Sequence, residues 1–213
     1  MINGFVYFRT KFFEAIEQRA VEKIFYKQPR FKELDALLSD AYLGSSGYEI
    51  SKAYLTKKGA KDVYTYGETP LTTMAQIAES FGITSKDRVI EMGAGRGRGA
   101  LFLGEYVGAQ VKGVELIPRF VEIFQETVSS DRVEMIQGDM FTLDFSWATV
   151  IYLFGTMLGE EQIKELAARF PKGTKILTVS YPLEEYAPEY RVEGQLVVRF
   201  PWGKTEIYSN VSK

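Results

Sequence analysis

A cluster of glycines between a strand and a helix constrains the fold of this chain more than any other feature. The stretch Glu91-Met-Gly93-Ala-Gly95-Arg-Gly97-Arg-Gly99 begins in the last residues of the run 88–92, which predicts a strand, and leads into a segment with helical spacing. Glycine lets the backbone turn tightly and approach a ligand closely, and free N–H groups at the start of a helix favour an anion. The cluster therefore predicts a ligand-binding loop in an α/β domain.

The segments after about residue 65 alternate between strand and helix patterns. Short apolar runs predict strands at residues 88–92, 111–115, 133–136, 149–154 and 175–180. A helix is expected before the first of these runs, with Thr69 as its N-cap, Pro70 at its first position and Gly82 at its end. Two further strands, residues 195–200 and 205–211, are joined by Pro201-Trp-Gly-Lys204 and predict a hairpin. We expect a doubly wound, seven-stranded, mostly parallel sheet, with ligands bound at the carboxyl ends of the strands.

The residues before this region have a different pattern, which predicts an N-terminal helical extension. Apolar residues recur at helical spacing in two stripes, and a third helix is expected from Tyr48 to Lys58. The first stripe consists of Phe5, Phe8, Phe12, Ile16, Ala20 and Ile24. It could contact a membrane or a partner, but such stripes are more often buried against the main domain. We expect a helical extension that helps to bind the substrate, residues 1–61, and a ligand-binding domain, residues 62–213.

Composition excludes several kinds of chemistry. The chain has no histidine and no cysteine, so it offers no imidazole base, no thiolate nucleophile and no zinc or iron–sulfur ligands, and we expect no metal site. Its net charge of -2 provides no overall basic field, which argues against a nucleic-acid partner. No segment approaches the ~18 apolar residues that span a bilayer, and the N-terminus lacks the pattern of a signal peptide. We expect a cytoplasmic protein.

Three carboxylates stand at the ends of three successive predicted strands. Glu91 ends the first strand, Glu115 ends the second, and Asp139 follows the third. A carboxylate at the position of Glu91 would repel a pyrophosphate but suits a ligand with an ammonium group, such as S-adenosylmethionine. Glu115 could accept both ribose hydroxyls, and Asp139 could hold the adenine amino group while Met140 packs on the ring. Alternatively, Asp139 is a structural cap and Glu115 a solvated charge at the sheet edge.

With the glycine loop, these acids resemble the class I, seven-β-strand, S-adenosylmethionine-dependent methyltransferases over residues 62–213. The resemblance implies a Rossmann-like methyltransferase domain that uses S-adenosyl-L-methionine and releases S-adenosyl-L-homocysteine. The residues that it assigns to cofactor binding are Tyr66, Glu68, Thr69, Glu91, Gly93, Gly95, Gly97, Arg98, Glu115, Asp139 and Met140.

A closer likeness is to the non-SET histone lysine methyltransferases, the disruptor-of-telomeric-silencing family, and to related small protein-lysine methyltransferases. Tyr66-Gly-Glu-Thr69 is similar to that family's cofactor-covering loop, and Trp202-Gly-Lys204 with Tyr208 resembles its terminal hairpin, where a tyrosine lines a lysine channel. The likeness implies a protein-lysine N-methyltransferase with a protein partner, in which Tyr208, Thr156 and Tyr66 serve catalysis. The stretch Phe154-Gly-Thr-Met157 departs from the family because it carries no amide, although Thr156 supplies a hydroxyl.

Methyl transfer from a sulfonium requires alignment of the nucleophile and a free lone pair rather than a histidine base. An apolar aromatic channel would lower the pKa of a lysine amine and so provide that lone pair. Two alternatives stay open. One is methylation of a small molecule or an RNA, with RNA disfavoured by the acidic balance of the chain. The other is a non-catalytic cofactor-binding module that acts through its N-terminal helices, which could also mediate oligomerisation.

Overall fold

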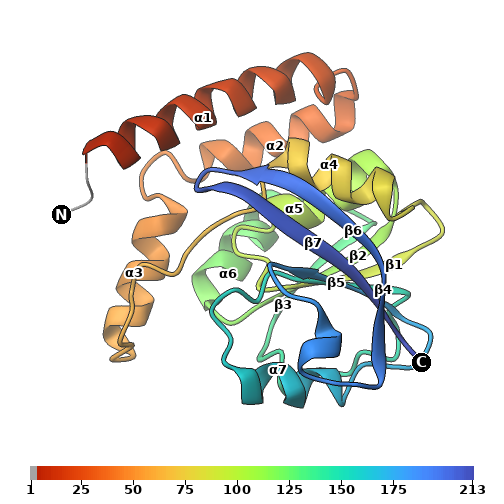
Figure 1. The fold of residues 1–213 in the computed structure, drawn as a ribbon. Coiled ribbons are helices and arrows are strands. Elements are labelled where there is room, and N and C mark those ends of the chain that lie inside the picture. The colour runs from red at the N-terminus through yellow and green to blue at the C-terminus, as the bar shows by residue number, and fades with distance from the viewer. Residues whose placement is uncertain (1–3) are drawn as a thin grey trace.

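The fold is described from a computed structural model, which covers residues 4–213, with side chains from residue 9 onward. Seven strands form one sheet in the order β3-β2-β1-β4-β5-β7-β6 (Figure 1). The strands are β1 (Arg88–Met92), β2 (Gln110–Glu115), β3 (Val133–Gln137), β4 (Val150–Leu153), β5 (Lys175–Val179), β6 (Tyr190–Phe200) and β7 (Gly203–Ser212). The first five strands are parallel, and β7 pairs antiparallel with both β5 and β6. The predicted seven-stranded, mostly parallel α/β sheet is confirmed.

The centre of this sheet is apolar on both faces, as expected for parallel strands covered by helices. All four residues of β4 are buried, as are four of the five in β1. The chain runs outward from β1 through β2 to β3 and then returns to β4 on the other side of β1. In open α/β sheets, ligands bind beyond the carboxyl ends of the strands at such a reversal of strand order. The segments that follow β1 and β4 therefore meet at the expected binding edge.

The terminal hairpin is longer than the sequence predicted. β6 begins at Tyr190 rather than at residue 195, because Gly194 takes part in a local irregularity of the β6–β7 pairing instead of ending the strand. The two strands then pair without interruption up to Phe200 and Gly203, and the connecting turn lies beyond the edge of the parallel strands. The hairpin thus provides one wall at the carboxyl edge of the sheet.

Helices cover both faces of the sheet. They are α4 (Leu71–Ser80), α5 (Arg98–Leu101), α6 (Pro118–Thr127) and α7 (Glu160–Ala167), with a π-helix η1 (Phe102–Val107) and a 3-10 turn η2 (Leu183–Glu185). The predicted Thr69 cap is wrong, because Pro70 occupies the N-cap of α4 while the Thr69 hydroxyl shares a 2.6 Å hydrogen bond with the Tyr152 hydroxyl. The single helix expected after the glycine loop is interrupted at Phe102, where it passes into η1.

The N-terminal helices are α1 (Gly4–Ile24), α2 (Pro29–Asp40) and α3 (Gly47–Lys57). They share the main hydrophobic core: α1 packs on α4, α2 packs on α5 and α6, and the Phe31 ring meets Phe102 edge-on at 5.6 Å (Figure 1). The predicted burial of the first stripe is wrong for Phe12, Ile16 and Ile24, which are 69%, 52% and 47% exposed, because α1 turns a neighbouring face with Val21 into the core. Phe5 and Phe8 lie outside the described side chains.

In the described part of the chain, no helix combines the length and apolar character needed to cross a membrane. The cytoplasmic location and the division at residues 61 and 62 stay predictions.

Candidate functional site

The glycine loop lies at the carboxyl end of β1 and leads into α5. Gly93, Gly95 and Gly97 all have positive φ angles, of 73°, 55° and 78°, a region that other residues rarely adopt. Space also demands glycine: a Cβ on Gly97 would lie 2.6 Å from the Phe124 ring, and a Cβ on Gly99 would lie 2.3 Å from Oε1 of Glu91. The loop is therefore held close to both the sheet and α6. Hydrogen bonds from the backbone N–H groups of Gly93 to the Val114 carbonyl and of Gly97 to the Ala94 carbonyl fix its shape.

Glu91 projects from β1 toward the start of α5. Its side chain is buried, and its Oε2 atom has no hydrogen-bond partner among the described residues. Burial raises the pKa of Glu91 to about 8, although a backbone hydrogen bond from Ala100 lowers it, and the negative charges of Glu68 and Glu115 add to the increase. A buried, unpaired carboxylate oxygen suits the ammonium group of a ligand, because an opposite charge would restore the ionised form.

A narrow cavity opens beside Glu91. It is lined by Gly67, Glu68, Thr69, Glu91, Gly93, Ala94, Arg98, Gly99 and Phe154. These residues come from the segment before α4, from the glycine loop and from the end of β4. The cavity therefore lies at the sheet edge where the strand order reverses, as predicted for the cofactor site. Within the part of the chain that the structure describes, no group of three or more acidic residues could hold a metal ion.

The segment from Tyr66 to Thr69 is fastened over the glycine loop. The Glu68 carboxylate accepts two hydrogen bonds from the Arg96 guanidinium, at 2.5 and 2.7 Å, and a third from the Tyr66 hydroxyl. Burial raises the pKa of Glu68, but Arg96 outweighs burial and holds that pKa below its usual value. The Tyr66 ring stacks on Phe120 with centroids 5.3 Å apart. Arg96 was not among the predicted site residues, and its position inside the glycine cluster was the only sequence signal for it.

Arg98 also has a structural partner that the sequence did not predict. Its guanidinium donates two hydrogen bonds, at 2.7 and 2.8 Å, to the fully buried carboxylate of Asp35 on α2. The Tyr26 hydroxyl donates a third hydrogen bond to the same carboxylate. The N-terminal helices are thus joined to the glycine loop by a buried ion pair, in addition to their apolar contacts.

Glu115 ends β2 and is buried next to the glycine loop. Its two carboxylate oxygens accept hydrogen bonds from the backbone N–H groups of Gly95 and Ile117, both at 2.8 Å. Burial raises the pKa of Glu115, and these backbone donors oppose the increase. Asp139 is exposed after β3, where its Oδ1 accepts from the Phe141 N–H at 2.9 Å and forms a local cap. Met140 is half-buried and packs against the second hydrophobic core.

Three aromatic rings form a wall next to the cavity, and this wall is defined by Phe154, Phe200 and Trp202. The Trp202 ring stacks on Phe200 with centroids 4.5 Å apart and lies 6.0 Å from the ring of Phe154, which lines the cavity. Trp202 stays 47% exposed at the tip of the hairpin. Thr156 follows Phe154 and is exposed at the same edge of the sheet. Phe154 and Trp202 belong to the aromatic residues that the sequence offered as walls of a substrate channel, whereas Phe200 was not predicted.

Tyr208 does not meet the other predicted residues. The pairing registers align it with Thr178 and Leu153, whereas Glu91 aligns with Tyr152, so Tyr208 and Glu91 project from opposite faces of the sheet. Its hydroxyl donates to Glu206 at 2.5 Å, and this hydrogen bond raises the pKa of Tyr208 to about 12. Of the three predicted catalytic residues, Tyr66 lies at the glycine loop, Thr156 lies at the edge of the sheet, and Tyr208 lies apart from the cavity.

Comparison with known proteins identifies the class of the domain. A sequence model of the family described as ribosomal RNA adenine dimethylase matches residues 68–180, more than half of the 213-residue chain. A search of curated proteins found no match.

Several solved structures share the fold. An RNA methyltransferase from Salinibacter ruber, in complex with S-adenosyl-L-homocysteine, is 23% identical, with a TM-score of 0.56 over 69% of this chain and 95% of that one. TrmN from Thermus thermophilus is 13% identical, with a TM-score of 0.59 over 78% and 53%. Magnesium protoporphyrin IX methyltransferase from Synechocystis, with bound S-adenosylmethionine, is 12% identical, with a TM-score of 0.56 over 79% and 98%. The expected class I methyltransferase fold and cofactor are therefore confirmed.

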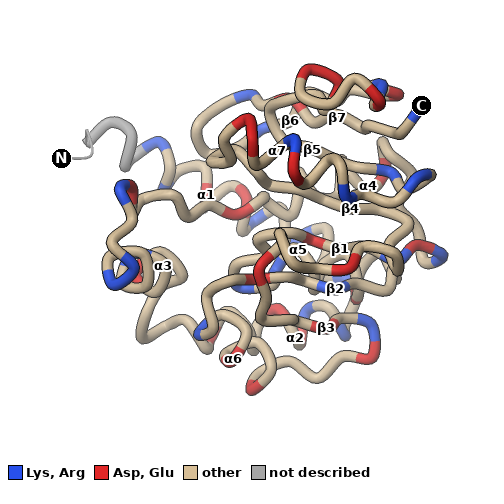
Figure 2. The backbone as a smooth tube through the Cα atoms, turned by 90° about the horizontal axis from the view of Figure 1, so that it is seen from below, with Lys and Arg blue, Asp and Glu red and all other residues tan. Residues whose placement is uncertain are grey.

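Two expectations are corrected by these findings. The resemblance to histone lysine methyltransferases is not supported, and the expected protein substrate without a nucleic-acid partner is contradicted by the match to a family that acts on RNA. The short motifs that resemble those enzymes do not form a lysine channel in this chain, since Tyr208 projects away from the cavity. The net charge misled because it is a sum over the chain. Figure 2 shows acidic and basic residues interspersed along the backbone, and their total does not tell which of them lie close together in the fold.

Proposed function

Since the chain belongs to the ribosomal RNA adenine dimethylase family, we propose that it methylates a base of an RNA, with adenine as the first candidate. The chain is an S-adenosylmethionine-dependent methyltransferase. The observation that carries the RNA assignment is the aromatic wall beside the cofactor cavity. Enzymes that modify a base in RNA or DNA take it out of its stack and hold it between aromatic or apolar side chains. Phe154 and Trp202 offer such faces at the edge of the cavity.

S-adenosylmethionine supplies an activated methyl group on a positively charged sulfur. On this proposal, Glu91 binds the ammonium group of this ligand with its unpaired oxygen. Glu115 binds the ribose, and Asp139 and Met140 bind the adenine. Tyr66, Glu68 and Thr69 cover the site, fastened by the ion pair with Arg96.

The acceptor chemistry is compatible with the residues at the edge of the sheet. An exocyclic amine of a base is neutral, so no residue has to remove a proton before the methyl group is transferred, in agreement with the absence of histidine. Stacking on an aromatic ring is worth about 1–3 kcal/mol per base and fixes the plane of the base. Thr156 lies on the loop after β4, and its hydroxyl oxygen can accept a hydrogen bond from the amine and so orient it.

The test is to incubate the protein with labelled S-adenosylmethionine and either total RNA or total protein, and to measure the label in each. The labelled RNA is then digested with nuclease and its nucleosides are identified by mass spectrometry. We expect label on an adenosine of the RNA. Trp202→Ala should reduce the rate of RNA methylation at least tenfold, about 1.4 kcal/mol, because it removes the exposed aromatic face. Trp202→Phe keeps an aromatic face and serves as the matched control, with most of the rate retained. Label in protein alone, or full activity of Trp202→Ala, would refute the proposal.

A further inference from the structure

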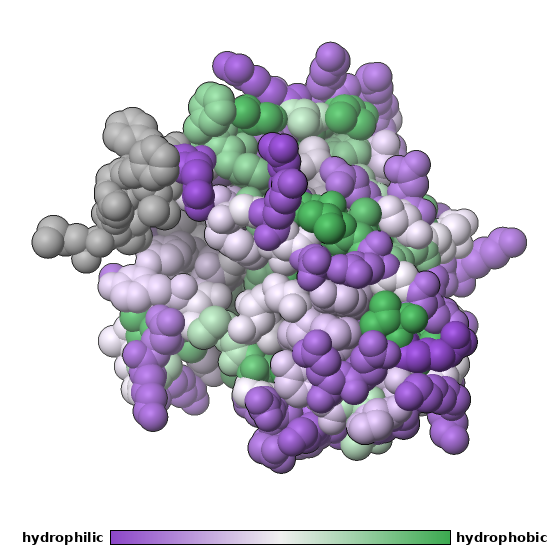
Figure 3. Space-filling model, viewed as in Figure 1, coloured by the Kyte–Doolittle hydropathy of each residue, from purple (hydrophilic) through white to green (hydrophobic). Residues whose placement is uncertain are grey.

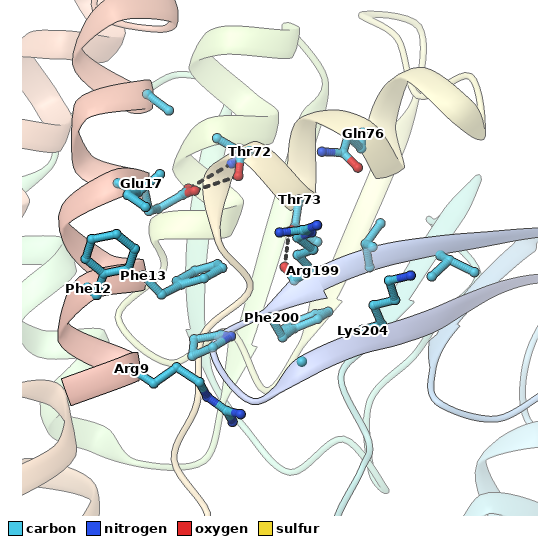
Figure 4. A pocket seen from close by; sticks show the side chains of 16 residues that line it. Arg9, Phe12, Phe13, Glu17, Thr72, Thr73, Gln76, Arg199, Phe200 and Lys204 are labelled. Carbon is cyan, nitrogen blue, oxygen red and sulfur yellow. Dashed lines mark hydrogen bonds between the residues drawn. The ribbon is translucent and has the colours of Figure 1, made fainter. Parts of the chain in front are cut away.

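A second and larger concavity lies beyond the aromatic wall. This groove of about 570 Å³ runs between α1, α4 and the β6–β7 hairpin (Figure 4). Phe12, Phe13 and Ile16 of α1 form one side, and Val198 and Phe200 of the hairpin contribute to the other. Exposed apolar side chains gather along the edge of the molecule formed by α1 (Figure 3). Clustered apolar surface of this kind marks a binding site in a soluble protein.

The charges of the groove point to an anionic ligand. Arg199 and Lys204 face each other directly across the hairpin, a register in which like charges destabilise a sheet. Neither of them forms a salt bridge with any residue that the structure describes. The one carboxylate that lines the groove, Glu17, already accepts hydrogen bonds from the backbone N–H and the hydroxyl of Thr72, at 2.9 and 2.5 Å (Figure 4). Glu206 lies on the same face of the hairpin, two residues from Lys204, but it forms no salt bridge with either cation, so neither charge is neutralised by an ion pair among the described residues.

The groove leads to the proposed acceptor site. Phe200 lines the groove and also stacks on Trp202, whose ring stands next to Phe154 in the cofactor cavity. Arg9, a third cation of the groove, donates a hydrogen bond of 3.1 Å from its guanidinium to the backbone carbonyl of Trp202. A ligand that occupies the groove therefore ends at the face on which the target base would stack.

We propose that this groove binds the single-stranded segment of RNA that flanks the base to be methylated. The inference rests on the proposed function, because it assumes an RNA acceptor. Binding sites for single strands combine aromatic side chains, on which bases stack, with cations that follow the phosphates. The groove offers the rings of Phe12 and Phe13 on one side and Arg199 and Lys204 on the other. The N-terminal helix thereby takes part in substrate binding through its exposed stripe.

The test measures the salt dependence of binding to a short, fluorescently labelled oligoadenylate by anisotropy. Neutralising three phosphates of a single strand gives a slope of about −2 in log affinity against log salt, an ~18-fold loss between about 50 and 200 mM salt. The double variant Arg199→Gln/Lys204→Gln leaves Arg9 as the one cation of the groove. We therefore expect its affinity for the oligoadenylate to fall only about 3-fold between the same two salt concentrations. Lys86→Gln/Lys172→Gln removes the same charge from two exposed lysines outside the groove and should keep the wild-type slope.

The outcomes separate this inference from the proposed function. RNA methylation by the wild type, together with the reduced slope of the double variant, supports both. If the wild type methylates RNA but the double variant binds the oligoadenylate with unchanged affinity and slope, the groove assignment is overturned while the RNA methyltransferase stands. If neither RNA binding nor RNA methylation is observed, or label enters only protein, both are overturned. Thermal unfolding of the double variant shows whether it is folded, and removal of a like-charge pair should not lower its melting temperature.

Discussion

Replacing Glu91 by glutamine should abolish a pH dependence of cofactor binding that the wild type shows near neutrality. The Glu91 carboxyl group is buried, its Oε2 is unpaired, and burial raises its pKa to about 8. Only the ionised carboxylate can pair with the ammonium group of the cofactor or its product. The site therefore has to lose a proton as the ligand binds, and glutamine has no proton to lose.

The size of the effect follows from this pKa. With a value of about 8, roughly nine in ten empty sites are protonated at pH 7, and about 99 in 100 at pH 6. The pKa of the carboxyl group is high in the empty site and low in the complex, so affinity rises with pH and levels off above the value for the empty site. Between pH 6 and 7 we expect an increase of about tenfold, or ~1.4 kcal/mol, with release of ~0.9 proton per ligand at pH 7.

The assay is calorimetry with S-adenosylhomocysteine at pH 6 and pH 7, in two buffers that differ in ionisation enthalpy. The chain has no histidine, so no other group with an ordinary pKa near 6.5 complicates this interval. Glu115→Gln is the comparator: it removes a neighbouring buried carboxyl group but leaves Glu91 in place, so the rise with pH should persist. Equal wild-type affinity at the two pH values without proton release, or an undiminished rise in Glu91→Gln, would refute the reasoning.

Two further predictions concern the parts that hold the glycine loop. Gly99→Ala should weaken binding of S-adenosylhomocysteine at least tenfold by calorimetry, because its Cβ would meet Oε1 of Glu91 at 2.3 Å; unchanged affinity would contradict the geometry. Asp35→Ala should lower the free energy of unfolding in urea by about 3–5 kcal/mol, since it leaves the Arg98 guanidinium unpaired in a buried position. The control is Glu33→Ala, which removes an exposed ion pair on the same helix and should lower the free energy of unfolding by at most about 1 kcal/mol. An equal decrease in the two variants would disprove the role of the buried pair.

Features that depend on local chemistry were predictable from the sequence. Strand and helix periodicity gave the order of the elements, and the parallel topology placed the ends of β1, β2 and β3 at one edge of the sheet. The positive φ angles of the glycine loop follow from the absence of a Cβ at Gly93, Gly95 and Gly97. The acid–glycine–acid spacing consequently identified the cofactor class before any fold was known.

Tertiary structure alone decided the properties that depend on packing and register. Glu68 and Arg96 lie 28 residues apart, and Asp35 and Arg98 lie 63 apart, so no local pattern announces either pair. The raised pKa of Glu91 comes from enclosure by segments distant in sequence.

Register likewise assigned the faces of the hairpin. It directed Tyr208 away from Glu91, and it brought Arg199 opposite Lys204 in a chain whose net charge is -2. A net charge adds up residues without regard to position, whereas binding depends on which charges the fold makes neighbours. The sequence therefore led to the methyltransferase and its cofactor, while the surface offered to the acceptor exists only once the hairpin and α1 pack together.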